Sequence, residues 1–337
     1  MRRVYFLLMT LIPLHIMAQE MPVVASANET FENITSISVE GEFCKVDVTK
    51  GEQVSLTAEL KAAKDLEGYA VDFHESAGVL NIKVQKPESG WTSHSGFVNL
   101  KVPQGVSINI QTTSGYINLV GISGSQLLAE SKSGKITADN LSGNVTLRSK
   151  SASIKANNIT GKLNVKSKGG SQAVRYVKGD VSLYSSGGAM IVENIKGSLK
   201  TESTDGEQTM KEIEGEIYLK TKSGAMKLSN AKGNIGSLSV SGVLNLFDVE
   251  GTLQLVATKG SIIGNRVKLT ASSNFQTTEG KIKLKFLNDK EQLTFACQSE
   301  HAYIIAYGKS KKKKLKMGAG PIVVTAVSTT GAMNFNK

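Results

Sequence analysis

Seven glycines spaced 18 residues apart constrain the fold of this 337-residue chain more than any other feature of its sequence. A fixed period of this kind indicates stacked structural units rather than a conventional globular core. One short repeat cannot bury its own apolar side, so neighbouring repeats must cover it. The series consists of Gly143, Gly161, Gly179, Gly197, Gly215, Gly233 and Gly251.

Each repeat has one internal pattern when its positions are counted as offsets from the closing glycine. Apolar residues prevail at offsets 2, 4, 11, 13 and 16, as in Val145 and Leu147 after Gly143. A second glycine stands at offset 9 in most repeats, as at Gly188 and Gly206. Alternating apolar positions predict two short strands per repeat, and glycine permits the bends between them. The chain is therefore predicted to be an all-β, single-stranded parallel β-solenoid, or β-helix, with right-handed coiling, 18-residue rungs and irregular terminal rungs.

Two polar columns of the repeat are expected to be structural. Offset 6 is serine or threonine in most repeats, and we expect these inward hydroxyls to hydrogen-bond along the stack. Offset 15 is often asparagine, a residue that accepts the left-handed conformation at a corner. The asparagines are Asn140, Asn158, Asn194 and Asn230, and the column is interrupted by Tyr176, Glu212 and Asp248.

The repeat divides the chain into four predicted segments. Residues 1–18 form a secretory signal peptide, because Arg2 and Arg3 precede an apolar run that ends at Ala18. Residues 19–110 supply N-terminal strands and capping rungs, residues 111–280 the regular solenoid, and residues 281–337 C-terminal strands and a cap. No later segment is apolar enough to predict a transmembrane span. The protein is expected in the periplasm, at the outer-membrane surface or outside the cell.

The positive net charge of the chain favours polyanionic partners. Removal of residues 1–18 eliminates two arginines and no acid, so the formal net charge falls from +11 to +9. Export makes nucleic acid a poor partner and anionic glycans or other envelope components better ones. The sequence leaves the oligomeric state open.

Two basic features are candidate polyanion-binding sites. Offsets 5 and 7 point outward on one face and are expected to form one exposed stripe of cationic side chains. The alternative is that these lysines keep a flat sheet soluble. A second run near the C-terminus is predicted to be a hairpin or long loop that binds anions or prevents edge pairing. The stripe consists of Arg148, Lys150, Lys166, Lys168, Lys220 and Lys222, and the run contains Lys311, Lys312, Lys313 and Lys314.

The sequence predicts no catalytic residue, no metal site and no cofactor. The acids at 205, 207, 212, 214 and 216 lie within one repeat, and neighbouring repeats offer no stacked aspartate cluster. We therefore expect a solvated edge rather than a calcium site or a glycosidase carboxylate pair. His74, His94 and His301 lack metal-ligand spacing. Trp91 lies in a polar loop where it packs on the solenoid or stacks on a sugar ring.

The two cysteines, Cys44 and Cys297, lie in an early and a late strand of the predicted stack. About a dozen rungs would separate them by about 50 Å, far beyond disulfide reach. We therefore expect two free, buried thiols, unless the ends fold together.

The layout resembles a family of exported bacterial envelope proteins called putative adhesins. The resemblance rests on a strand-rich start at 31–41, a strand that runs into proline at 98–103, and Ser-Gly corners at 114–115 and 133–134. The signal ending Ala18-Gln19 is similar to those of Bacteroidetes-type bacteria. The resemblance carries no catalytic motif. We expect a non-catalytic envelope or surface protein whose long flat faces mediate adhesion or glycan contact. The alternatives are a periplasmic scaffold or stress-response accessory that binds a protein, and a β-helix polysaccharide lyase or glycosidase.

Overall fold

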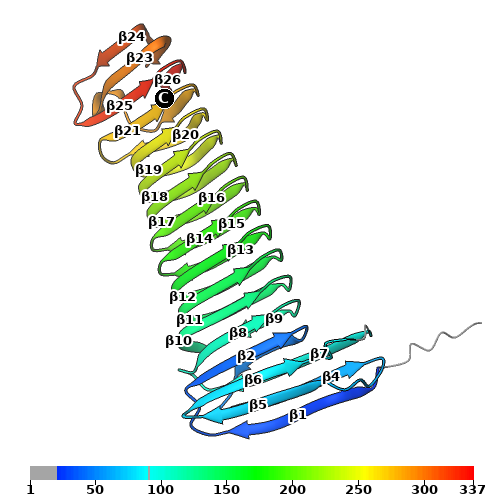
Figure 1. Cartoon of the computed structure of the whole chain (residues 1–337). Coiled ribbons are helices and arrows are strands. Elements are labelled where there is room, and N and C mark those ends of the chain that lie inside the picture. The colour runs from blue at the N-terminus through cyan, green and yellow to red at the C-terminus, as the bar shows by residue number, and fades with distance from the viewer. Residues whose placement is uncertain (1–20, 90–91) are drawn as a thin grey trace, which may run out of the picture.

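The computed structural model describes residues 21–89 and 92–337, and within them the chain winds into one long stack of parallel strands (Figure 1). The predicted signal peptide and Trp91 lie outside the described residues. No helix among the described residues combines the length and hydrophobicity that a bilayer crossing requires. The prediction of an all-β parallel solenoid is confirmed.

The solenoid has two walls of strands, here named face A and face B, which enclose the core. Six strands of 14 residues bend from one face into the other at a corner. In five of them the first half belongs to face B and the last half to face A, and in the sixth the order is reversed. These six are β11 (Ile136–Ser149), β12 (Ile154–Ser167), β17 (Gln208–Thr221), β18 (Met226–Ser239), β19 (Leu244–Ala257) and, at the C-terminal end with the opposite order of faces, β23 (Leu293–Ala306).

Shorter strands complete both faces. Face A also contains β2 (Ser36–Glu42), β8 (Ser107–Thr112), β10 (Ser123–Ser131), β14 (Val181–Ser185), β16 (Leu199–Ser203), β21 (Ser273–Thr277) and β25 (Ile322–Ser328). Face B also contains β3 (Lys45–Lys50), β9 (Ile117–Val120), β13 (Gln172–Lys178), β15 (Met190–Lys196), β20 (Ile262–Leu269), β22 (Ile282–Phe286) and β26 (Met333–Asn336).

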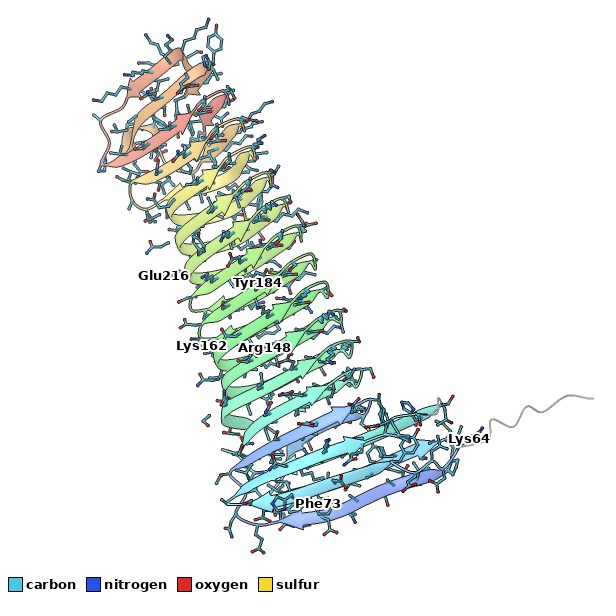
Figure 2. The ribbon with its side chains drawn as sticks, in the orientation of Figure 1. Lys64, Phe73, Arg148, Lys162, Tyr184 and Glu216 are labelled. Atoms are coloured by element: carbon cyan, nitrogen blue, oxygen red, sulfur yellow. The ribbon has the colours of Figure 1, made fainter. Side chains whose placement is uncertain are left out.

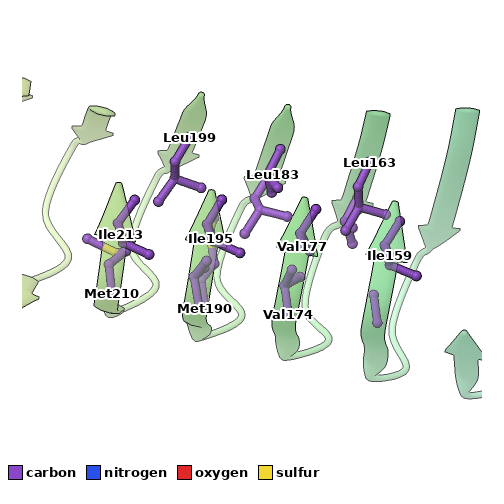
Figure 3. Packing of buried hydrophobic residues seen from close by; sticks show 14 of the residues in the cluster. Ile159, Leu163, Val174, Val177, Leu183, Met190, Ile195, Leu199, Met210 and Ile213 are labelled. Carbon is purple, nitrogen blue, oxygen red and sulfur yellow. The ribbon is translucent and has the colours of Figure 1, made fainter. Parts of the chain in front are cut away.

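The core consists of the predicted inward columns. In-register pairing places Leu147 beside Val165 and then Leu183, so identical offsets stack directly. Figure 3 shows the same repetition along the columns of Val177, Ile195 and their neighbours. All these side chains are buried. Burial of apolar surface stabilises the fold by about 25 cal/mol per Å². A rung buries its apolar side chains only when neighbouring rungs cover them.

The two corners of a rung are built differently. At offset 15 the predicted left-handed conformation is confirmed, with φ between 52° and 58° at the four asparagines Asn140, Asn158, Asn194 and Asn230. At offset 6 the prediction of hydroxyls bonding along the stack is wrong for most rungs. Ser167 donates to the carbonyl of Gly170 in its own rung, at 2.9 Å, and Ser239 does the same with Gly242, at 2.6 Å. Among the described residues, Ser131 and Thr277 instead donate to a glycine carbonyl of the preceding rung, each at 3.4 Å.

The N-terminal end departs from a simple continuation of the stack. β6 (Val79–Gln85) and β7 (His94–Val102) pair in parallel beneath β2 and β3, although they follow them in sequence. Antiparallel strands then close the end: β5 (Ala70–Ser76) pairs with β6, and β1 (Val23–Phe31) and β4 (Val54–Ala62) extend from β7. The turn between β5 and β6 holds Ala77 and Gly78 at positive φ, which makes the hairpin favourable.

The C-terminal end is also reordered. β25 and β26 stack directly on β21 and β22, and β23 lies on top of them. The 3-10 turn Lys290–Gln292 leads into β23. The lysine run that we expected as a hairpin or long loop forms a strand, β24 (Lys309–Met317), which is the second arm of an antiparallel hairpin with β23. It forms the terminal edge, where charged side chains oppose pairing with other chains.

Cys44 and Cys297 are both free and buried. Cys44 lies in the bend between β2 and β3 rather than in a strand, because its N–H bonds to the carbonyl of Gly41 at 2.7 Å and closes a turn. Cys297 lies in β23 at the opposite end of the stack. With strands about 4.8 Å apart, more than about 40 Å separates the two thiols.

We expect both thiols to resist modification in the native protein and to react after unfolding in guanidinium. Burial raises the pKa of each thiol from 9.0 to about 12, partly opposed at Cys297 by a backbone hydrogen bond with Ala326. Because the folded state holds these protons more tightly, this contribution to stability is complete below pH 9 and is lost as pH rises toward 12. Thiol titration checks the first expectation. A Cys44–Cys297 linked peptide from unreduced monomer would contradict the linear stack.

Candidate ligand-binding surfaces

The predicted basic stripe lies on face A, as expected from the spacing. Strand register places Arg148, Lys166, Tyr184, Glu202 and Lys220 in one line across five rungs. Figure 2 shows Arg148 and Tyr184 on the same side of the ribbon. Lys150, Lys168 and Lys222 occupy the adjoining turns and are exposed.

Two rungs without cations divide this line into unequal parts. Lys220 donates a hydrogen bond to Glu202 at 2.5 Å, and this contact and the carboxylate charge raise the pKa of Lys220. Arg148 lies 3.7 Å from Glu130, and Lys166 lies over the Tyr184 ring at 5.3 Å from its centroid. The residues Arg148, Lys150, Lys166 and Lys168 form the compact part, here named the basic cluster.

A shallow groove of about 390 Å³ follows the basic cluster and also includes Lys132 and Glu130. No carboxylate in the described part of the chain lies within ion-pair distance of Lys150, Lys166 or Lys168. Cationic side chains about 4.8 Å apart on stacked strands repel one another. An anion that crosses these rungs would relieve the repulsion.

The strand β24 presents the other predicted cations far from the basic cluster, at the C-terminal end (Figure 1). Lys311, Lys312, Lys313 and Lys314 are all exposed, and Lys312 lies over the Tyr303 ring at 5.0 Å. The structure therefore separates the two predicted cationic regions.

The acidic patch does not form a paired-carboxylate site. Glu207 pairs with Lys227 at 2.5 Å, Glu212 with Lys211 at 3.1 Å, and Asp205 accepts a hydrogen bond from Ser223. Residues 21–89 and 92–337 contain no group of three or more potential metal-ligating side chains. His94 instead packs edge-on against Phe43, with ring centroids 4.3 Å apart.

Sequence reasoning missed a larger hollow, here named the corner groove, along the offset-15 corner. It has a volume of about 710 Å³ and extends across six rungs. Its amide and aromatic lining comes from Asn140, Asn158, Tyr176, Asn194 and Asn230, and its charged lining from Lys178, Lys196, Lys232, Glu212 and Glu214. The available signal was Tyr176, a bulky aromatic in a column of asparagines.

Comparisons with known proteins give a family for the second half of the solenoid. Residues 173–331 match the family model described as Toastrack DUF4097. No curated protein matches the chain.

Solved structures that resemble the chain include putative adhesins from two Parabacteroides species. The one from Parabacteroides distasonis is 12% identical with a TM-score of 0.27, and covers 92% of this chain and 95% of that one. The one from Parabacteroides merdae is 13% identical with a TM-score of 0.26, and covers 93% and 95%. A putative cell adhesion protein from Clostridium sporogenes is 10% identical with a TM-score of 0.17, and covers 92% and 99%. The resemblance predicted from the sequence is confirmed: residues 173–331 of this chain match the Toastrack family model.

Proposed function

We propose that the protein is a non-catalytic, exported envelope or cell-surface protein that binds anionic glycans or other surface polyanions through the basic cluster. One observation carries the proposal: four cationic side chains stack on two adjacent rungs of an exposed wall with Glu130 as their nearby acid. The predicted signal peptide supports export. A flat, repetitive wall presents charge at regular intervals, which suits a polymer with repeating anionic groups.

Lys220 and Lys222 are secondary in this proposal. The Glu202 carboxylate already neutralises Lys220, and the rungs that carry Tyr184 and Glu202 separate the pair from the cluster. A polyanion therefore gains more from the cluster than from the whole stripe. The lysines of β24 are too distant to extend the same contact.

Replacing the cluster as R148Q/K150Q/K166Q/K168Q is expected to weaken binding to heparin by about tenfold or more. Surface ion pairs contribute about 0.2–1 kcal/mol each, and 1.4 kcal/mol corresponds to a tenfold change in Kd. Binding by the unaltered protein should weaken steeply as salt rises above about 0.1 M, because the Debye length shrinks below about 10 Å. Isothermal titration at several salt concentrations measures both effects.

The matched control is K155Q/K281Q/K283Q/K285Q, which removes the same charge from exposed positions on face B. It should retain most of the affinity, and K220Q/K222Q should fall between the two. Equal losses from the face A and face B variants would indicate a response to net charge alone. Unchanged heparin binding after loss of the cluster would exclude it as the site.

A further inference from the structure

The corner groove contains an aromatic residue in a corner column that otherwise holds asparagine or charged residues. Offset 15 holds the left-handed conformation in every regular rung, and Tyr176 adopts it with φ 55°. Asparagine tolerates this conformation, whereas a bulky L-residue there is unusual and costs energy. Glu212, Asp248 and Arg266 hold the same conformation, so the corner of the repeat imposes it. What distinguishes Tyr176 is its aromatic ring.

Tyr176 gains little from burial in return. The residue is 55% exposed, and no hydrogen bond of its hydroxyl is found among the described residues. Tyr176 lines the groove together with Ile159, Val177 and Ile195, whose side chains are buried in the core (Figure 3). An exposed ring above an ordered wall offers a flat apolar surface to a ligand.

The polar lining is rich in amides and nearly balanced in charge. Each asparagine amide offers two donors and one acceptor oxygen, which suits hydroxyl groups that both donate and accept. The side chains of Asn140, Asn194 and Asn230 make no hydrogen bond to other side chains in the described segments. Three lysines face two glutamates, and Lys196 lies 4.0 Å from Glu214.

We propose that the corner groove binds an uncharged glycan chain that runs along the solenoid axis, with one sugar ring stacked on Tyr176 and its hydroxyls bonded to the asparagine amides. Both the volume and the combination of one aromatic surface with a few polar groups are typical of ligand sites. This site lies on a corner, away from the basic cluster on face A, and it favours a ligand of different charge.

The experiment titrates the purified protein with cellohexaose, xylohexaose, mannohexaose and maltohexaose. We expect at least one hexasaccharide to bind, with an affinity that changes less than twofold between 0.1 and 0.5 M salt. Tyr176→Asn restores the residue type of the column. It should fold with an unchanged or higher melting temperature and lose binding at least tenfold, because it removes the ring. Tyr176→Phe should stay within about threefold of the unaltered protein.

Two controls separate this site from the proposed polyanion site. Tyr184→Ala removes a similarly exposed ring from face A and should leave hexasaccharide binding intact. The variant R148Q/K150Q/K166Q/K168Q should also retain it while losing heparin. The inference is overturned if none of the four sugars binds, or if Tyr176→Asn and Tyr184→Ala weaken binding equally. Heparin binding remains an independent result in either case.

Discussion

Replacing Gly197 with alanine is expected to destabilise the middle of the solenoid by about 2–6 kcal/mol. Two costs add at this position. Gly197 has φ 142°, a conformation that L side chains rarely adopt and that costs about 1–3 kcal/mol. A Cβ there would also lie 2.3 Å from the carbonyl oxygen of Gly179 on the preceding rung, and such overpacking costs about 1–3 kcal/mol more.

The matched control lies only ten residues away. A Cβ added at Gly187 would have no atom within 4 Å, so Gly187→Ala should be neutral or slightly stabilising. Thermal denaturation compares the two variants, and hydrogen exchange locates the loss. We expect faster exchange in β14–β17, because each rung contacts only its neighbours. Equal melting temperatures for the two variants would mean that the glycine column is not what permits the close stacking.

The regular part of the fold could be predicted because its determinants are local and repeated. The offsets that the sequence marks as apolar are the buried columns, and the seven glycines of the 18-residue series hold positive φ. The period then fixes which side chains lie next to one another, and this is why Arg148 and Lys166 could be assigned to one line.

The two ends could not be predicted in the same way. Their strand order depends on pairing between distant segments, such as β2 with β6, and no period marks it. The hairpin turns Ala77-Gly78 and Tyr307-Gly308 did carry a local signal, a residue followed by glycine with both at positive φ in the structure. They separate short alternating runs and indicate antiparallel pairs, which do not follow the 18-residue period.

The candidate surfaces show the same limit. Spacing alone gives the columns on face A but not whether Glu202 engages Lys220 or leaves it free. The corner groove arises from the space between stacked corners, so it is visible only when six rungs are assembled. The sequence shows that Tyr176 interrupts the asparagine column. Only the assembled groove shows that this residue is exposed among the groove-lining asparagines.

Replacing Phe295 with alanine is expected to open the C-terminal cap. Its ring is fully buried in β23, with centroids 5.6 Å from Phe335, 6.2 Å from Phe286 and 5.8 Å from Tyr307. Loss of a buried phenylalanine costs about 3–5 kcal/mol. Because β23 is the last parallel strand and holds the lysine-rich β24, its release would expose the edge of β25.

An exposed strand edge is a template for pairing with another chain, so Phe295→Ala should form higher oligomers as well as melt earlier. Light scattering after size-exclusion chromatography measures the first effect, and hydrogen exchange in β23–β25 measures the second. Phe247→Ala is the control, because its ring is 47% exposed on face B and its loss should change stability by less than about 0.5 kcal/mol. If Phe295→Ala stays as monomeric and as stable as Phe247→Ala, the aromatic cluster does not hold the cap, and the lysines of β24 alone must protect the edge.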